Sequence, residues 1–251
     1  MKEQIWKSSS LVKKYLSGVR GAIPLASEQL DIMMRLISKV EEPIGTFLDV
    51  GCGDGILAAT ILERYPAIKG VCLDFSEPML NAAKEKLSDF SHNIEFILLD
   101  YGDHNWIEGL ESTKTFDLIV SGFSIHHQID ERKKELYQDF FSLLTPGGLF
   151  LNNEHVSSST TWIESICDDM FIDNLYEMRP TFELEKTREQ VAKDYYYRPD
   201  KDANILAPVE EQCDWLRRIG FKDVDCYFKV FELAVFGGRK PLSFFGATPV
   251  V

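Results

Sequence analysis

Short apolar runs alternate with helix-compatible segments along the middle of the chain. The apolar runs span residues 47–50, 70–74, 94–99, 116–121 and 149–151. Polar or amphipathic stretches separate them, as in chains that alternate strands with helices. This alternation predicts a parallel sheet with helices on both faces, built from residues 44–153.

Two further segments are predicted to be mainly helical. Residues 1–43 contain a short helix at 11–16, a break at Gly18, Gly21 and Pro24, and a better helix that begins at Ser27. Residues 154–207 form an insertion before the last strands, and the apolar residues between positions 162 and 172 predict one helix in it.

The last segment, residues 208–251, predicts one helix followed by two strands. Pro208 starts the helix and Gly220 ends it as a C-cap. Residues 224–231 and 233–236 are apolar or alternating and predict two antiparallel closing strands. We interpret all four segments as parts of a single domain.

The first predicted strand ends in Gly51, Gly53 and Gly55, and a helix-compatible run follows at once. Glycine permits positive φ and lets the backbone approach a ligand closely. The free N–H groups at the start of the next helix then face whatever binds there. A glycine-rich turn alone is also found where a strand joins a helix and nothing binds.

The next two predicted strands end in carboxylates. Asp74 follows the second strand, about twenty residues after the turn, which is where a Rossmann-type unit places an acid on a ribose. Asp100 follows the third strand. Because the carboxyl ends of parallel strands lie along one edge of a sheet, the turn and both acids predict a ligand site at that edge.

In these residues the sequence resembles the class I S-adenosylmethionine-dependent methyltransferases. The matching motifs are the turn at 48–55, Asp74 with the Phe-Ser that follows it, Asp100, and the segments 116–121 and 144–148. The resemblance implies a Rossmann-like, doubly wound, mostly parallel seven-stranded sheet with an antiparallel last strand. A nicotinamide enzyme more usually carries Gly-x-Gly-x-x-Gly, whereas this chain has Ile56 where that pattern has glycine.

The resemblance also implies cofactor contacts. Asp74 would accept hydrogen bonds from both ribose hydroxyls of S-adenosylmethionine, Asp100 with Tyr101 would flank the adenine, and Asp49 would lie beneath the turn. The other cofactor residues that it implies are Gly51, Cys52, Gly53, Phe75, Met79, Ser121 and Arg20, the last from a lid formed by residues 1–43. The alternatives are a helix-capping or solvent-facing acid for Asp74, a solvent-facing strand-end acid for Asp100, core packing for Phe75 and Met79, and a solvated loop arginine for Arg20.

The fourth strand is followed by Ser-Gly-Phe-Ser-Ile-His-His at 121–127. Methyltransferases that act on nucleobase or protein amides often carry Asn/Asp-Pro-Pro-Tyr/Phe here, so this stretch resembles the small-molecule branch of the family instead. His126 and His127 are the candidates for a general base, because imidazole titrates near neutral pH. The alternative is a histidine that caps the next helix or packs beneath the cofactor.

Candidate substrate contacts follow later in the chain. Glu154 and His155 close the fifth strand at the same edge, and Glu154 is equally suited to be a hydrogen-bonding anchor. Tyr197 and Arg198 belong to a Tyr-Tyr-Tyr-Arg run that would form an aromatic and cationic wall for an anionic substrate, or else a surface helix end. The histidines are far apart in sequence, so no metal site is expected.

The amino-acid composition limits the classes of binding partner that we expect for this protein. The chain of 251 residues has 27 basic and 40 acidic side chains and a formal charge of −13, which argues against a broad surface for nucleic acid or anionic membranes. Its five cysteines show no metal-ligand spacing, and no signal-peptide core or bilayer-length apolar run occurs. We therefore expect reduced thiols and a cytoplasmic protein, either a monomer or a homodimer.

The sequence thus predicts an S-adenosylmethionine-dependent methyltransferase that acts on a small molecule. Two alternatives stay open. The N-terminal Arg-x-x-Ile-Pro and the region from 209 to the last strands also resemble carboxy-S-adenosylmethionine synthases, although the glycine turn lacks that family's usual Asp-Leu-Gly-Cys-Ser. The second alternative is a non-catalytic subunit that binds the cofactor and partners a catalytic chain.

Overall fold

The computed structural model describes residues 6–17, 19–110 and 115–242. Seven strands form one sheet in the order β3-β2-β1-β4-β5-β7-β6. Their bounds are β1 Thr46–Val50, β2 Lys69–Asp74, β3 Ile94–Leu98, β4 Phe116–Gly122, β5 Leu144–His155, β6 Lys222–Val230 and β7 Leu233–Arg239. Strand β7 runs antiparallel to both of its neighbours, and the pairings among β1 to β5 are parallel. The predicted fold class is confirmed.

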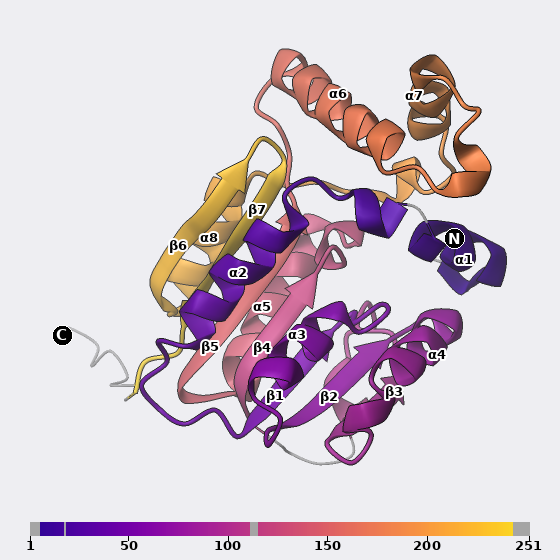
Figure 1. Ribbon diagram of the computed structural model, residues 1–251. Coiled ribbons are helices and arrows are strands. Elements are labelled where there is room, and N and C mark those ends of the chain that lie inside the picture. The colour runs from indigo at the N-terminus through magenta and orange to yellow at the C-terminus, as the bar shows by residue number, and fades with distance from the viewer. Residues whose placement is uncertain (1–5, 18, 111–114, 243–251) are drawn as a thin grey trace.

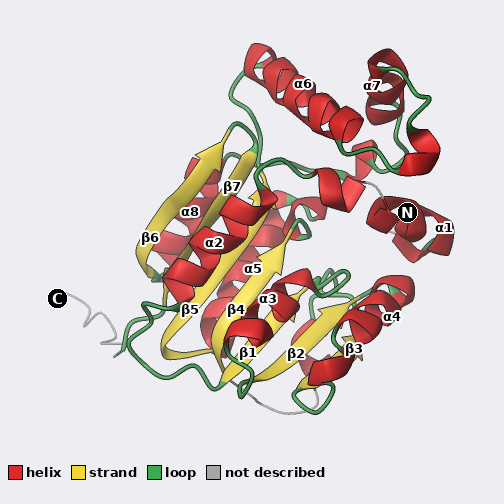
Figure 2. Ribbon diagram, viewed as in Figure 1, coloured by secondary structure: helices red, strands yellow, loops and turns green. Residues whose placement is uncertain are grey.

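Helices cover both faces of the sheet (Figures 1 and 2). They are α2 Ala26–Ile37, α3 Ile56–Arg64 and α4 Glu77–Lys86 on one face, and α5 Asp130–Leu143 and α8 Val209–Ile219 on the other. Because side chains alternate along a strand, Phe47 packs into the first of these cores and Leu48 into the second. Both are fully buried, so β1, an inner strand of the sheet, is hydrophobic on each side.

Local sequence signals explain several of these boundaries. Ser76 is the N-cap of α4 and accepts a hydrogen bond from the Met79 N–H at 3.4 Å, with Pro78 in the first turn. Pro208 precedes α8, and Gly220 follows it with φ 120°. The predicted start of α8 at Pro208 and its predicted C-cap at Gly220 are confirmed.

The start of β5 differs from the prediction. The sequence suggested that residues 146–148 turn the chain from helix into a strand at 149. Helix α5 instead ends at Leu143 and the strand begins at Leu144. A register shift against β4 between Phe116 and Leu118, together with Gly147 at φ 84°, absorbs the irregularity that the Pro-Gly-Gly sequence introduces.

The remaining helices gather beyond the carboxyl ends of the strands (Figure 1). They are α1 Ser9–Ser17, η2 Val19–Ala22, α6 Thr161–Glu177, η6 Thr181–Glu183, α7 Arg188–Tyr196 and η7 Lys201–Ala203. Shorter 3₁₀ turns occur at η3 Ser88–Phe90, η4 Trp106–Gly109 and η5 Ile125–His127. Among the residues described, none of the helices has both the length and the apolar character that crossing a membrane requires.

Candidate functional site

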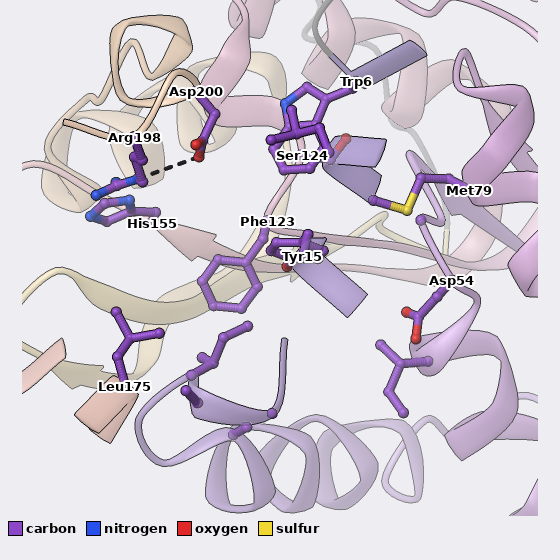
Figure 3. A pocket seen from close by; sticks show the side chains of 18 of the residues that line it. Trp6, Tyr15, Asp54, Met79, Phe123, Ser124, His155, Leu175, Arg198 and Asp200 are labelled. Atoms are coloured by element: carbon purple, nitrogen blue, oxygen red, sulfur yellow. Dashed lines mark hydrogen bonds and ion pairs between the residues drawn. The ribbon is translucent and has the colours of Figure 1, made fainter. Parts of the chain in front are cut away.

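A cavity of about 540 Å³ lies at the carboxyl ends of the parallel strands. The lining includes the N-terminal segment, the turn after β1, the end of β2 with the start of α4, the loop after β4 and the insertion between β5 and α8. Figure 3 shows Met79 and Asp54 on one side, the Arg198–Asp200 pair and His155 on the other, and Phe123 and Ser124 between them. The cavity therefore joins the predicted cofactor edge to the predicted substrate cover.

The glycine turn forms one wall of this cavity. Gly51 and Gly53 have φ values of 65° and 54°, which side-chain-bearing residues rarely adopt. A Cβ on Gly51 would lie 1.9 Å from Ser124 Oγ, so the loop after β4 packs directly on the bare backbone. A Cβ on Gly53 would meet nothing within 4 Å, so this position leaves free space beside the cavity for a ligand.

Asp74 closes the turn from the end of β2. Its Oδ2 accepts a hydrogen bond from the Gly53 N–H at 2.9 Å, and its Oδ1 accepts one from the Ser76 N–H at 2.8 Å. Burial outweighs these bonds and, with the nearby Asp100 charge, raises the pKa of Asp74 to about 6. A carboxylate has about four lone-pair sites, so Asp74 keeps acceptor capacity for two more donors.

The residues present fit S-adenosylmethionine. The open space at Gly53, the free acceptor capacity of Asp74 and the positive-φ turn provide a ribose acceptor and a close backbone approach. Asp49 accepts a hydrogen bond from the Ala58 N–H at 3.3 Å, beneath the turn. The expected cofactor residues that line the cavity are Asp49, Gly51, Cys52, Gly53, Asp74, Phe75 and Met79.

Three other expected cofactor residues lie outside the cavity lining. Tyr101 is buried because it points into the core, where its hydroxyl contacts Ser124 Oγ at 2.6 Å. Ser121 donates to the Val50 carbonyl at 2.8 Å within the sheet. The Asp100 carboxylate accepts the Gly102 N–H at 2.8 Å, so it caps a turn beside Asp74. These three residues do not line the cavity, and the side chain of Arg20 lies outside the described residues.

His126 and Glu154 form a buried pair, of which His126 lines the cavity. Nδ1 of His126 lies 2.6 Å from Glu154 Oε1, and the exposed fractions of the two side chains are 7% and 1%. A carboxylate partner makes Nδ1 the protonated nitrogen and leaves a lone pair on Nε2. Within the described residues Nε2 makes no hydrogen bond, and His126 lines the cavity.

Glu154 therefore lies behind His126, and it does not line the cavity. It also accepts hydrogen bonds from the His126 N–H at 3.1 Å and the His155 N–H at 2.9 Å. Asn152 Nδ2 approaches it at 3.5 Å. Of the two roles considered from the sequence, the position of this side chain matches the hydrogen-bonding anchor.

The two other candidate histidines, His127 and His155, have different surroundings. His127 Nδ1 lies 3.2 Å from the Ala203 carbonyl, and burial, followed by the charge of His126, lowers the pKa of His127 well below its ordinary value. His155 lines the cavity, and its Nε2 lies 2.9 Å from Glu232 Oε2. A second imidazole–carboxylate pair thus stands beside the first, with the His126 and His155 rings 5.8 Å apart.

The insertion brings Arg198 into the cavity and leaves Tyr197 outside it. The Arg198 guanidinium lies over the Tyr195 ring at 4.4 Å and pairs with Asp200 at 3.3 Å. Tyr197, the C-cap residue of α7, is 81% exposed and does not line the cavity.

Sequence reasoning missed several residues of the site: Trp6, Phe123, Phe171 and Arg179 line the cavity, and Glu232 contacts the lining residue His155. Glu232 reaches His155 from the turn between β6 and β7, a pairing 77 positions apart that no local motif signals. Phe171 lies in the apolar stretch that predicted α6, and the periodicity alone gave no sign that it faces the cavity. In the part of the chain that the structure describes, no cluster of His, Cys, Asp and Glu is arranged to hold a metal.

Sequence comparison places the core in a known family. A family described as "Methyltransferase domain" matches residues 47–148. A carboxy-S-adenosyl-L-methionine synthase of Nautilia profundicola is 22% identical over 218 residues, 86% of each chain. A malonyl-[acyl-carrier protein] O-methyltransferase of Ilyobacter polytropus is 41% identical over 101 residues, which are 40% of this chain and 34% of the relative.

Solved structures share the fold. The carbon methyltransferase CurJ superposes with a TM-score of 0.57 at 20% identity, over 85% of this chain and 54% of the other. Human N-acetylserotonin methyltransferase, in complex with S-adenosylmethionine, gives 0.51 at 17% identity, over 94% and 58%. The chain spans little more than half of these solved chains. Residues 47–148 thus match a methyltransferase domain, and the chain as a whole shares the fold of these methyltransferases.

Proposed function

We propose that this protein transfers a methyl group from S-adenosylmethionine to an O–H or N–H group of a small-molecule acceptor, with His126 as general base. One observation carries the proposal. The cavity wall that contains the glycine turn and Asp74 also contains His126, whose Nδ1 is held by Glu154 and whose Nε2 is left without a partner among the described residues.

Bound S-adenosylmethionine supplies an activated methyl group at this edge. Asp74 would hold the ribose, the backbone at Gly51 and Gly53 would approach the methionine part, and Phe75 and Met79 would pack on the adenosine. Asp100, which does not line the cavity, would approach the adenine from its place beside Asp74. His126 Nε2 accepts the acceptor's proton as the acceptor attacks, and the Glu154 carboxylate keeps the imidazole in the required tautomer.

Substitution of the base tests this role. We expect His126→Asn to lower kcat by about 10²–10⁴-fold, the usual contribution of a positioned general base, while the affinity for S-adenosylhomocysteine changes little. Glu154→Gln should lower kcat as well, because the amide can present an N–H to His126 Nδ1 and favour the wrong tautomer. The measurement is S-adenosylhomocysteine formation with acceptors found in a screen of phenols, acids and amines.

His104→Asn is the matched control, since His104 is 77% exposed and pairs with Glu135 far from the cavity lining. It should keep wild-type turnover. Turnover by His126→Asn at the wild-type rate would contradict the assignment of the base.

A second candidate function is that of a carboxy-S-adenosylmethionine synthase, which modifies the cofactor itself. The length of one alignment favours this function. The Nautilia relative aligns over 86% of both chains, so the match includes parts outside the methyltransferase core. Mass spectrometry of the ligand released from the purified protein distinguishes the two, because the carboxylated form is heavier than S-adenosylmethionine. Methyl transfer by the isolated chain would in turn exclude a non-catalytic cofactor-binding subunit.

We further propose that residues 1–43 act as a lid and residues 154–207 as a substrate cover around the core at 44–153, with residues 208–251 closing the sheet. Free cysteines at all five positions support a reducing, cytoplasmic setting. The net charge of −13 supports a small molecule rather than nucleic acid as the partner. A monomer and a homodimer are both compatible with this proposal.

A further inference from the structure

A continuous wall of rings connects the proposed base to a guanidinium inside the cavity. Starting at His126, the ring of His155 follows at 5.8 Å, that of Phe171 at 6.0 Å and that of Tyr195 at 6.1 Å. The Arg198 guanidinium then lies 4.4 Å from the centre of the Tyr195 ring. All five side chains line the same cavity.

The cationic end of this wall is rigidly built. The Arg198 Nη1 donates to the Tyr195 carbonyl at 2.9 Å, and its Nε donates to Asp200 at 3.3 Å. The Tyr195 hydroxyl is itself fixed by a 2.7 Å bond to Asp168. Stacking and hydrogen bonds of this kind hold a guanidinium in one orientation, which lowers the entropy lost when it binds a ligand.

Arg198 nevertheless keeps donors for a ligand. A guanidinium has five N–H groups, of which the contacts above use two. Nη2 makes no hydrogen bond within the described part of the chain, and the side chain is 21% exposed. The edge formed by Nη1 and Nη2 can therefore bind a planar carboxylate in bidentate geometry.

The other basic side chains of the insertion are less suited to this task. Lys186, which also lines the cavity, lies between Glu183 and Asp194, each at 2.8 Å, so two carboxylates already surround its charge. Arg179 has its Nε fully covered by protein atoms and its guanidinium against the Tyr176 ring. Among the described lining cations of the insertion, Arg198 is thus the one with both a fixed orientation and accessible donors.

Resting on the methyltransferase function proposed above, we infer that the acceptor is an aromatic acid whose carboxylate binds Arg198. Its planar body lies along the rings of Tyr195 and Phe171, and its acidic O–H or N–H reaches Nε2 of His126. A ligand that contacts both ends of the wall needs a proton donor near His126 and an anionic group near Arg198. The rings between them favour an aromatic body through stacking.

Binding of matched acid and amide probes tests this inference without any turnover. The probes are para-hydroxybenzoate and para-hydroxycinnamate, each paired with its neutral amide, titrated calorimetrically with and without S-adenosylhomocysteine. We expect wild-type protein to bind at least one acid about tenfold or more tightly than its amide, as a charge-assisted bidentate pair predicts. Arg198→Met should remove this preference and leave the amide's affinity unchanged, which also reports that the cavity is intact.

Arg188→Met is the matched control, because Arg188 lies in the same insertion, is 41% exposed, pairs with Asp169 and Asp173, and does not line the cavity. It should keep the wild-type preference. Asp200→Asn should strengthen acid binding, because it removes a carboxylate that competes for Arg198.

The inference is overturned if wild-type protein shows no preference for either acid, or if Arg198→Met keeps the preference. Failure to bind S-adenosylhomocysteine would instead count against the proposed function. The two failures are distinguishable because the probe titrations are also run without that ligand.

Discussion

The Asp74 carboxylate is buried, and in the proposed function it also binds the ribose of the cofactor. Two backbone N–H groups hold it in place, yet desolvation raises its pKa from the ordinary 3.8 to about 6. Such a raised value means that the apoprotein takes up a proton here as the pH falls through about 6. In the proposed function the two ribose hydroxyls of the cofactor donate hydrogen bonds to the ionised form, so proton and cofactor would compete for one carboxylate.

The affinity for S-adenosylhomocysteine should therefore fall as the pH drops below about 6, with one proton released on binding in that range. Calorimetry in buffers of different ionisation enthalpy measures that proton directly. Asp74→Asn should bind weakly at every pH and release no proton in this range. A wild-type affinity that stays constant down to about pH 5 would contradict the ribose role of Asp74.

Two neighbouring glycines should respond differently to the same substitution. Gly51→Ala places a methyl group 1.9 Å from Ser124 Oγ, so the loop after β4 must move, and we expect a large loss of stability. Gly53→Ala meets nothing within 4 Å and should cost about 1–2 kcal/mol, from its left-handed backbone alone.

Thermal unfolding and S-adenosylhomocysteine binding together measure this pair. Gly53→Ala should fold and yet bind the ligand more weakly, because its methyl group occupies the space beside the turn. Wild-type affinity in Gly53→Ala would mean that the cofactor does not approach this backbone.

In the proposed function, the insertion at residues 154–207 is the element that recognises the substrate. Its two helices, α6 and α7, are joined by the 2.7 Å bond between the Tyr195 hydroxyl and Asp168, and by the stacked rings of Phe171 and Tyr195. Helix α7 also has a capping box, in which Thr187 and Gln190 satisfy each other's backbone N–H groups. These contacts make the insertion a defined unit rather than a loose cover.

Tyr195→Phe should loosen this unit while keeping the ring under Arg198. We expect the free energy of unfolding to fall by about 1–2 kcal/mol, the usual cost of losing a buried hydrogen bond to a charged group. Hydrogen exchange should become faster in α6 and α7, and acid probes should bind more weakly. Tyr197→Phe is the control, because that ring is 81% exposed, and equal effects of the two variants would contradict the role given to Tyr195.

At the scale of the whole molecule, the sheet was predictable because its signals are local. The runs that became β1, β2 and β3, and the acid at the end of β2, are each readable within a few residues. Helix ends are marked by Ser76, whose side-chain hydroxyl caps α4, and by Pro208 and Gly220, whose backbone conformations suit the two ends of α8. The start of β5 was mistaken because Pro-Gly-Gly is an equally good signal for a turn and for an irregular strand.

The site was only partly predictable, because its pairings join distant residues. Glu154 lies 28 positions after His126, and nothing between them indicates which of the two faces the cavity. The pairing of His155 with Glu232 depends on how β5 and β7 are aligned. Tyr101 follows a strand end, as a cofactor residue would, but the packing of the loop after β4 draws its hydroxyl inward.

Equilibrium binding of S-adenosylhomocysteine to wild-type protein and to Asp74→Ala near neutral pH tests the central claim most directly. The account predicts one site per chain, with an affinity at least about 100-fold lower in Asp74→Ala, because two charge-assisted hydrogen bonds are lost. Absence of binding to the wild-type protein, or equal binding to both, would contradict the placement of the cofactor at the glycine turn and Asp74.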